Sequence, residues 1–113
     1  MDGSNAPACW HDVCGLDDIW PDTGVCARIA GRQVAVFRLR DDRLFALDNY
    51  DPAADANVLS RGLVGNLGER LVVASPVYKH HYDLVTGACL DDPALAVRAY
   101  RVRLVDGRVQ VAV

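Results

Sequence analysis

The sequence predicts an all-β domain of barrel-like or sandwich-like shape, and three observations lead to this prediction. The chain has 113 residues, a length that suits one domain. Apolar residues recur at every second position in several short segments, which is the period of a β-strand rather than of a helix. Gly and Asp residues that favour turns separate these segments. We therefore expect residues 9–113 to form a single domain, preceded by a disordered N-terminal tail over residues 1–8.

The expected strands are short and rich in Val, Leu, Ile and Phe. In chain order they cover residues 25–29, 33–40, 43–47 and 71–74, with turns at residues 30–32 and 41–42. Single helical turns are expected at residues 16–19 and at residues 93–95. Asp17-Asp18 lies near the N-terminus of the first turn and Asp91-Asp92 precedes the second, and we expect these carboxylates to accept hydrogen bonds from backbone N–H groups.

Two stretches between these strands are irregular. Residues 48–69 lack a clear period and contain Gly62, Gly65 and Gly68, so we expect a long functional loop with a flexible glycine-rich part. The spacing of these glycines matches neither a Walker loop nor a dinucleotide fingerprint. Residues 75–81 form the second irregular stretch, which interrupts two strands.

The clearest unit is a hairpin at the C-terminus. Asp106-Gly107 predicts a two-residue type I′ turn, because glycine accepts the positive φ that this turn requires. The turn fixes the register, since a slip by one residue would expose the apolar set. On the apolar side it places Leu104 opposite Val109, Val102 opposite Val111 and Tyr100 opposite Val113; on the other side it places Arg103 opposite Gln110 and Arg101 opposite Ala112.

Composition and charge exclude several function classes. Twelve basic and fifteen acidic side chains give a net charge of −3, and the arginines are scattered, which argues against nucleic acid as a partner. No run of about eighteen apolar residues occurs, so we expect no transmembrane helix. The N-terminus lacks the pattern of a secretory signal, so we expect a cytoplasmic protein whose cysteines are thiols: Cys9, Cys14, Cys26 and Cys89.

The cysteines offer one candidate metal site. Cys9, His11 and Cys14 have metal-ligand spacing, but no Cys-x-x-His follows to complete a cluster, and a structural zinc site would need a distant fourth ligand. Whether these three residues bind a metal stays open at this point. In the plainer interpretation, Cys14 and Cys26 are small core residues on strands.

The histidine pair His80-His81 is the other candidate. Adjacent side chains of an extended chain point to opposite faces, so the two imidazoles are not expected to share a metal. Hydrogen bonding is the plainer role, and a partner-facing role beside Tyr78 and Lys79 is the alternative. Ser75 lacks the elbow of a catalytic serine, and we expect no catalytic residues in this chain.

The two irregular stretches together resemble the ligand loops of Rieske iron–sulfur domains. Residues 45–53 resemble the first loop, where a strand runs into Cys-Pro-His. Residues 75–87 resemble the second, Cys-Pro-x-His-Gly-x-x-Phe-Asp-Leu-x-Thr-Gly, and keep its proline, the aromatic residue before Asp-Leu and the closing Thr-Gly. All four ligands are replaced: Asp51 and Ala53 stand at the first Cys and His, and Ser75 and Tyr78 at the second.

These replacements remove the chemistry that a two-iron cluster needs. Alanine has no lone pair, and a hydroxyl or phenol is a poor substitute for a thiolate or a neutral imidazole at iron. We therefore expect neither a cofactor nor a metal in this chain. Hydrogen bonds among Asp51, Ser75 and Tyr78 are expected to hold the two loops together instead.

Among Rieske-type domains, the sequence is similar to the small subunits of NADH-dependent assimilatory nitrite reductases. The similarity runs from Trp10 to Val113 and is carried by Trp10-x-x-Val13-Cys14 and by residues 18–19, 31–37, 48–52, 57–62 and 75–79. The combination of Asp-Asn-x-Asp-Pro with Ser-Pro-x-Tyr-Lys is quite specific to this branch.

The resemblance implies a Rieske-like domain of three antiparallel sheets and a role in nitrate and nitrite assimilation. The chain would be a non-catalytic accessory subunit of an oxidoreductase. It would dock on a large subunit that carries FAD, an iron–sulfur cluster and sirohaem and reduces nitrite to ammonium with NADH. We expect docking through the two former ligand loops, at Asp51, Tyr78, Lys79, His80 and His81. Two alternatives remain open: a ferredoxin-like electron carrier and a stand-alone binding module.

Overall fold

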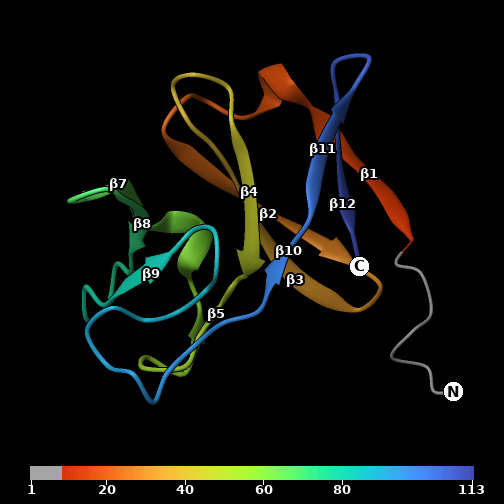
Figure 1. Cartoon of the computed structure of the whole chain (residues 1–113). Coiled ribbons are helices and arrows are strands. Elements are labelled where there is room, and N and C mark those ends of the chain that lie inside the picture. The colour runs from red at the N-terminus through yellow and green to blue at the C-terminus, as the bar shows by residue number, and fades with distance from the viewer. Residues whose placement is uncertain (1–8) are drawn as a thin grey trace, which may run out of the picture.

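The computed structural model describes residues 9–113, which contain twelve β-strands and two short 3₁₀ helices (Figure 1). The disordered tail expected at residues 1–8 lies outside the described residues. The strands form four antiparallel sheets, which are three larger sheets and a two-stranded ribbon. The all-β prediction is confirmed, with the ribbon added to the three expected sheets. None of the sheets closes into a barrel within residues 9–113, so the barrel-like alternative is wrong.

The four-stranded sheet, in the order β10-β4-β3-β2, is the central layer. Val34, Ala35, Val36 and Phe37 on β3 are all fully buried, although they are consecutive. Both faces of this sheet are covered, because Ala35 and Phe37 pack in one core cluster and Val34 and Val36 in another. The strands are β2 (Thr23–Ile29), β3 (Arg32–Arg38), β4 (Leu44–Asp48) and β10 (Ala99–Tyr100).

A three-stranded sheet, β1-β12-β11, packs on one face of the central sheet and joins the two ends of the described chain. Its strands are β1 (Trp10–Gly15), β11 (Val102–Val105) and β12 (Arg108–Ala112). The hairpin register is confirmed for four pairs: Val102 with Val111, Arg103 with Gln110, Leu104 with Val109 and Val105 with Arg108. The backbone N–H of Ala112 also donates to the Arg101 carbonyl at 2.9 Å.

One pair expected of this hairpin is wrong. Tyr100 does not pair with Val113, because the chain leaves the hairpin at Arg101 and Tyr100 pairs with Ala46 in the central sheet. There its hydroxyl donates to Oδ1 of Asp48 at 2.5 Å. Leu104 is 45% exposed, since β11 is an edge strand and its apolar side is incompletely covered.

The other face of the central sheet carries a third sheet, β7-β8-β9, and the ribbon β5-β6 follows the end of β4 in the chain (Figure 1). Val73, Tyr82 and Leu84 pack there in one cluster with Phe37 and Leu47 of the central sheet. The elements of this part are β5 (Tyr50–Asp51), β6 (Ala56–Asn57), the helix η3 (Leu59–Arg61), β7 (Leu63–Leu67), β8 (Arg70–Ala74) and β9 (His81–Asp83).

The prediction of a long loop over residues 48–69 is wrong, because this stretch contains β5, β6, η3 and β7. Gly65 lies inside β7 and pairs with Val72. Gly68 occupies the turn between β7 and β8 with φ of +61°, so these glycines shape a hairpin rather than a flexible loop.

Of the two expected helical turns, one is confirmed. The helix η2 (Leu16–Asp18) is present, and the Asp18 carboxylate accepts a hydrogen bond from the backbone N–H of Gly15 at 2.8 Å. Residues 93–95 instead form a plain turn, in which the N–H of Leu95 donates to the Asp92 carbonyl at 3.0 Å. Within residues 9–113, no helix is both long enough and apolar enough to cross a membrane.

Candidate functional site

The first former ligand loop (residues 49–58) is fixed by Asn49, which is almost completely buried. Its Oδ1 accepts a hydrogen bond from the N–H of Ser60 at 2.7 Å, and its Nδ2 donates to Oε1 of Gln33 at 3.1 Å. The Asn49 carbonyl also accepts from the N–H of Leu59 at 3.0 Å. One amide side chain thus ties the loop to β3 and to η3. The role of Asn49 was not predicted from the sequence, although this polar residue directly follows β4.

The second former ligand loop (residues 75–80) is a single closed turn of chain between β8 and β9. The N–H of Ser75 donates to the His80 carbonyl at 2.9 Å, and the N–H of Lys79 donates to the Ser75 carbonyl at 3.0 Å. Pro76, Val77, Tyr78 and Lys79 are all exposed at its tip. Both ends of the loop are therefore fastened while its tip faces solvent.

Asp51 joins the two loops through a buried set of hydrogen bonds, which we call the polar lock: Asp51, Ser75 and Tyr82. The carboxylate is completely buried. It accepts hydrogen bonds from the Ser75 hydroxyl, from the Tyr82 hydroxyl at 2.6 Å and from the N–H of Ala53 at 3.0 Å. Hydrogen bonds to a carboxylate in a low-dielectric interior are strong. The bond from Ser75 joins the two loops directly, the bond from Tyr82 ties the first loop to β9, and the bond from Ala53 lies within the first loop.

The polar lock also sets the protonation states of its members. Burial by itself would raise the pKa of Asp51, but the hydrogen bonds from Ser75, Tyr82 and the backbone outweigh it and hold the pKa below its ordinary value. Burial, together with the hydrogen bond to the Asp51 carboxylate, raises the pKa of Tyr82. The lock therefore consists of an ionised carboxylate and two neutral hydroxyl donors at neutral pH.

The expected hydrogen bond between Asp51 and Ser75 is present, but Tyr78 takes no part in the lock. Tyr78 is 63% exposed, and Tyr82 supplies the phenol in its place. Tyr82 stands at the aromatic position before Asp-Leu, where the Rieske pattern has Phe. The hydroxyl group that Tyr82 has and Phe lacks is the sequence feature that could have identified Tyr82 as the third member of the polar lock.

The remaining residues expected at the docking face differ in how they are held. His81 donates its N–H to Oδ2 of Asp91 at 2.6 Å, and its Nδ1 lies 3.0 Å from the same oxygen. The ring of His80 meets that of Tyr78 edge-to-face, with centroids 6.5 Å apart, and its Nδ1 is buried without a partner among the described residues. Asp51 lies beneath this surface, so the exposed part of the site is the tip with Tyr78 and Lys79.

The cysteines and His11 do not form a metal site in the part of the chain that the structure describes. No group of three or more Cys, His, Asp or Glu side chains is arranged to hold an ion there. All four cysteines are free thiols. Cys14 is half-buried on β1 and Cys26 is exposed on β2, so the expectation of two core cysteines is wrong for Cys26. β2 is an edge strand, so its side chains, including that of Cys26, have a neighbouring strand on one side only.

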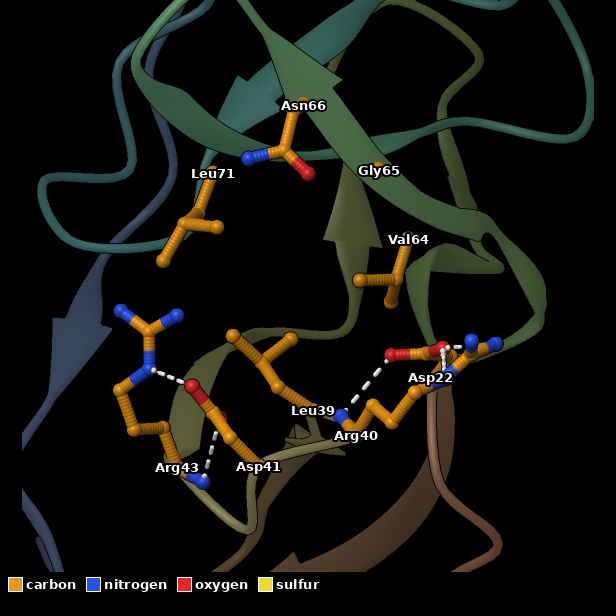
Figure 2. A pocket seen from close by; sticks show the side chains of 9 residues that line it. All are labelled: Asp22, Leu39, Arg40, Asp41, Arg43, Val64, Gly65, Asn66 and Leu71. Carbon is orange, nitrogen blue, oxygen red and sulfur yellow. Dashed lines mark hydrogen bonds and ion pairs between the residues drawn. The ribbon is translucent and has the colours of Figure 1, made fainter.

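A hollow of about 510 Å³ lies elsewhere, between the β3–β4 turn and the β7–β8 hairpin. Figure 2 shows Leu39, Val64 and Leu71 between two arginines, each turned towards an aspartate. Arg40 pairs with Asp22 at 3.0 Å and Arg43 with Asp41 at 2.8 Å. The charges of this hollow are thus already neutralised within it, and none of its lining residues belongs to the two loops.

The fold and its two loops match a known family. A family model for the Rieske-like [2Fe-2S] domain matches residues 9–112. The chain belongs to this Rieske-like family. A nitrite reductase (NADH) small subunit from Escherichia coli K12 is 45% identical over 103 residues, which are 90% of this chain and 95% of that relative. The resemblance to these small subunits is thereby confirmed.

Two further relatives of this Rieske-like chain bear on its role. A crystal structure of a proposed NADH-dependent nitrite reductase small subunit from Mycobacterium tuberculosis superposes with a TM-score of 0.90 at 42% identity, covering 94% of this chain and 96% of that one. A nitrite reductase [NAD(P)H] large subunit from Klebsiella oxytoca is 44% identical over 102 residues, which are 90% of this chain but 11% of that protein.

The residues of this Rieske-like chain do not fit a [2Fe–2S] cluster. The positions that the resemblance assigns to the two thiolates hold the Asp51 carboxylate and the Ser75 hydroxyl, which are hydrogen-bonded to each other. The positions of the two imidazoles hold the methyl group of Ala53 and the exposed phenol of Tyr78. A cluster of this type requires two thiolates and two imidazoles, whereas these four positions offer a carboxylate, a hydroxyl, a methyl group and a phenol.

Proposed function

We propose that this chain is a non-catalytic accessory subunit of an NADH-dependent nitrite reductase, that it holds no cluster, and that it docks on the large subunit. The Klebsiella oxytoca protein supports this most directly, because there a segment resembling this chain is part of a large-subunit polypeptide. Covalent linkage keeps two modules at high effective concentration, which is useful where they act together. The separate small subunits among the relatives then represent the same assembly in two chains.

In this proposal the chemistry belongs to the partner. The large subunit would carry FAD, an iron–sulfur cluster and sirohaem and would reduce nitrite to ammonium with electrons from NADH. NADH as electron donor and free thiols in this chain support a cytoplasmic location. The chain itself supplies a surface and no reacting group.

The docking face that we propose is the tip of the second former ligand loop. It carries Val77 and Tyr78, which are 49% and 63% exposed, beside the exposed Lys79. Aromatic residues are enriched among the residues that dominate interfaces. The polar lock holds the loop in place before binding, so little conformational entropy is lost on association.

The two alternatives have less support. A ferredoxin-like carrier needs an iron–sulfur centre, and the donor set described above does not fit one. If this chain were a stand-alone binding module, there would be no reason for a similar segment to be part of a large-subunit polypeptide, as it is in the Klebsiella oxytoca protein.

Tyr78→Ala tests this proposal. We expect the dissociation constant for the purified large subunit, measured by isothermal titration calorimetry, to increase about 30-fold, as for a residue that contributes about 2 kcal/mol to binding. Leu104→Ala is the matched control, because Leu104 is also exposed but lies on β11 in another sheet. Unchanged affinity of Tyr78→Ala, or equal losses in both variants, would remove the second loop as the docking face.

A further inference from the structure

Lys79 has a backbone conformation that its side chain does not favour. Its φ is +59°, in the left-handed region. Six non-glycine residues within residues 9–113 have positive φ, and four of them are aspartates, whose short polar side chains tolerate this region. Ala30 is followed by Gly31 in the tight turn between β2 and β3. Lys79 is the one long side chain in this group.

The shape of the second former ligand loop explains the left-handed backbone conformation at position 79, but it does not explain why the residue there is lysine. The hydrogen bond from the N–H of Lys79 to the Ser75 carbonyl closes one helical turn, and Lys79 is its last residue. A helical turn that ends in the left-handed region usually ends in glycine. The loop by itself therefore favours glycine at position 79, so a separate requirement must favour the lysine.

The ammonium group of Lys79 has no role within the domain. Lys79 is exposed, and it makes no side-chain hydrogen bond or ion pair with any residue from 9 to 113. It is also the sole lysine of the chain, while the other basic residues are arginines. Several of these arginines pair with carboxylates of the domain, as Arg38, Arg40 and Arg108 do. Lys79 thus differs from these three arginines in having no ion pair among residues 9–113, and from every arginine of this part of the chain in its positive φ.

We infer that Lys79 is retained for an acidic group on the large subunit, which its ammonium contacts beside the pocket that receives Tyr78. This inference rests on the proposed function and names the chemistry of the partner surface: an apolar depression with a carboxylate at its rim. The adjacent Val77 and Tyr78 supply the apolar part of the contact. A flexible lysine can place its point charge on a carboxylate without the planar geometry that an arginine demands.

Three variants separate the charge from the backbone strain. Lys79→Gly should raise the melting temperature, because glycine relaxes the left-handed position, and yet should weaken binding of the large subunit about tenfold. Lys79→Gln keeps a long side chain without charge and should also lose about tenfold in affinity. Lys79→Arg should bind within about threefold of the wild type. The affinity of the wild type should fall with salt more steeply than that of Lys79→Gln.

Calorimetric titration of the full-length chain into the large subunit, at low and high salt, gives the affinities, and thermal unfolding of each variant gives the melting temperatures. Wild-type affinity for Lys79→Gly and Lys79→Gln would overturn the inference and leave the proposed function standing. If the wild type itself does not bind the large subunit, both the proposed function and this inference fail. A loss of affinity in Lys79→Gln with an unchanged salt dependence would also contradict the role of charge.

Discussion

Asp51→Ala is expected to lower the free energy of unfolding by about 3 kcal/mol. The substitution removes the acceptor of the buried hydroxyls of Ser75 and Tyr82 and of the half-buried N–H of Ala53. Each buried donor that loses its partner costs about 1 kcal/mol or more. Urea denaturation followed by tryptophan fluorescence or circular dichroism measures the difference.

Smaller changes to the polar lock should have smaller effects. Tyr82→Phe and Ser75→Ala each remove one donor and should cost about 1–2 kcal/mol. Asp17→Ala is the matched control, because the Asp17 side chain is fully exposed and its contact with Arg38 is 4.0 Å long. It should cost less than about 0.5 kcal/mol. Equal stability of Asp51→Ala and Asp17→Ala would show that the buried carboxylate does not hold the loops.

The pH dependence of this effect follows from the lowered pKa of Asp51. A carboxylate whose pKa is lower in the folded state stabilises the fold above the pKa of the unfolded chain, about 3.9. This contribution is lost as the pH falls through the lower, folded-state pKa. The stability gap between the wild type and Asp51→Asn should therefore be widest near neutral pH and narrow below about pH 4. A gap that widens with acidification would contradict the direction of the shift.

Gly87→Ala is expected to destabilise the domain by more than about 3 kcal/mol, enough to prevent folding of a small domain. A Cβ atom on Gly87 would lie 2.0 Å from the carbonyl oxygen of Val97, and φ is +82°. The backbone cannot move away easily, because the Gly87 N–H donates to Asp83 and its carbonyl accepts from Val97, both at 2.8 Å. Soluble yield and thermal melting measure the loss.

Gly107→Ala is the control for the backbone conformation alone. Gly107 has φ of +77°, but nothing lies within 4 Å of the position of its Cβ. It should cost about 1 kcal/mol, the usual effect of placing alanine in the left-handed region. If both variants were destabilised equally, the contact with Val97 would not be the reason.

Strands with a strong local pattern could be predicted from the sequence, and strands held by distant contacts could not. The C-terminal hairpin follows from Asp106-Gly107 and its apolar partners, and its register is confirmed over four pairs. β7 escaped prediction because Gly65 and Asn66 interrupt its apolar pattern and three of its residues are exposed at the edge of a sheet. The ribbon β5-β6 is two residues on each strand, too short for any period to appear.

The site could be predicted only in part, because some of its residues follow a local sequence pattern and others are brought together only by distant contacts. Asp51 and Ser75 were found because they stand at positions of a recognisable pattern, and they do meet. Tyr82 belongs to another strand, and only the fold brings its hydroxyl to Asp51 across 31 residues of sequence. Tyr100 was likewise assigned to the wrong sheet, because a hydrogen bond to Asp48, 52 residues away, holds it in the central one.

We propose that hydrogen bonds, and not iron, join the two former ligand loops. Iron and acid-labile sulfide should be measured in the full-length chain, purified without oxygen from cells that overproduce the iron–sulfur assembly machinery. We expect a colourless, folded protein with far less than one iron per chain, whereas about two irons and two sulfides per folded chain would contradict the account.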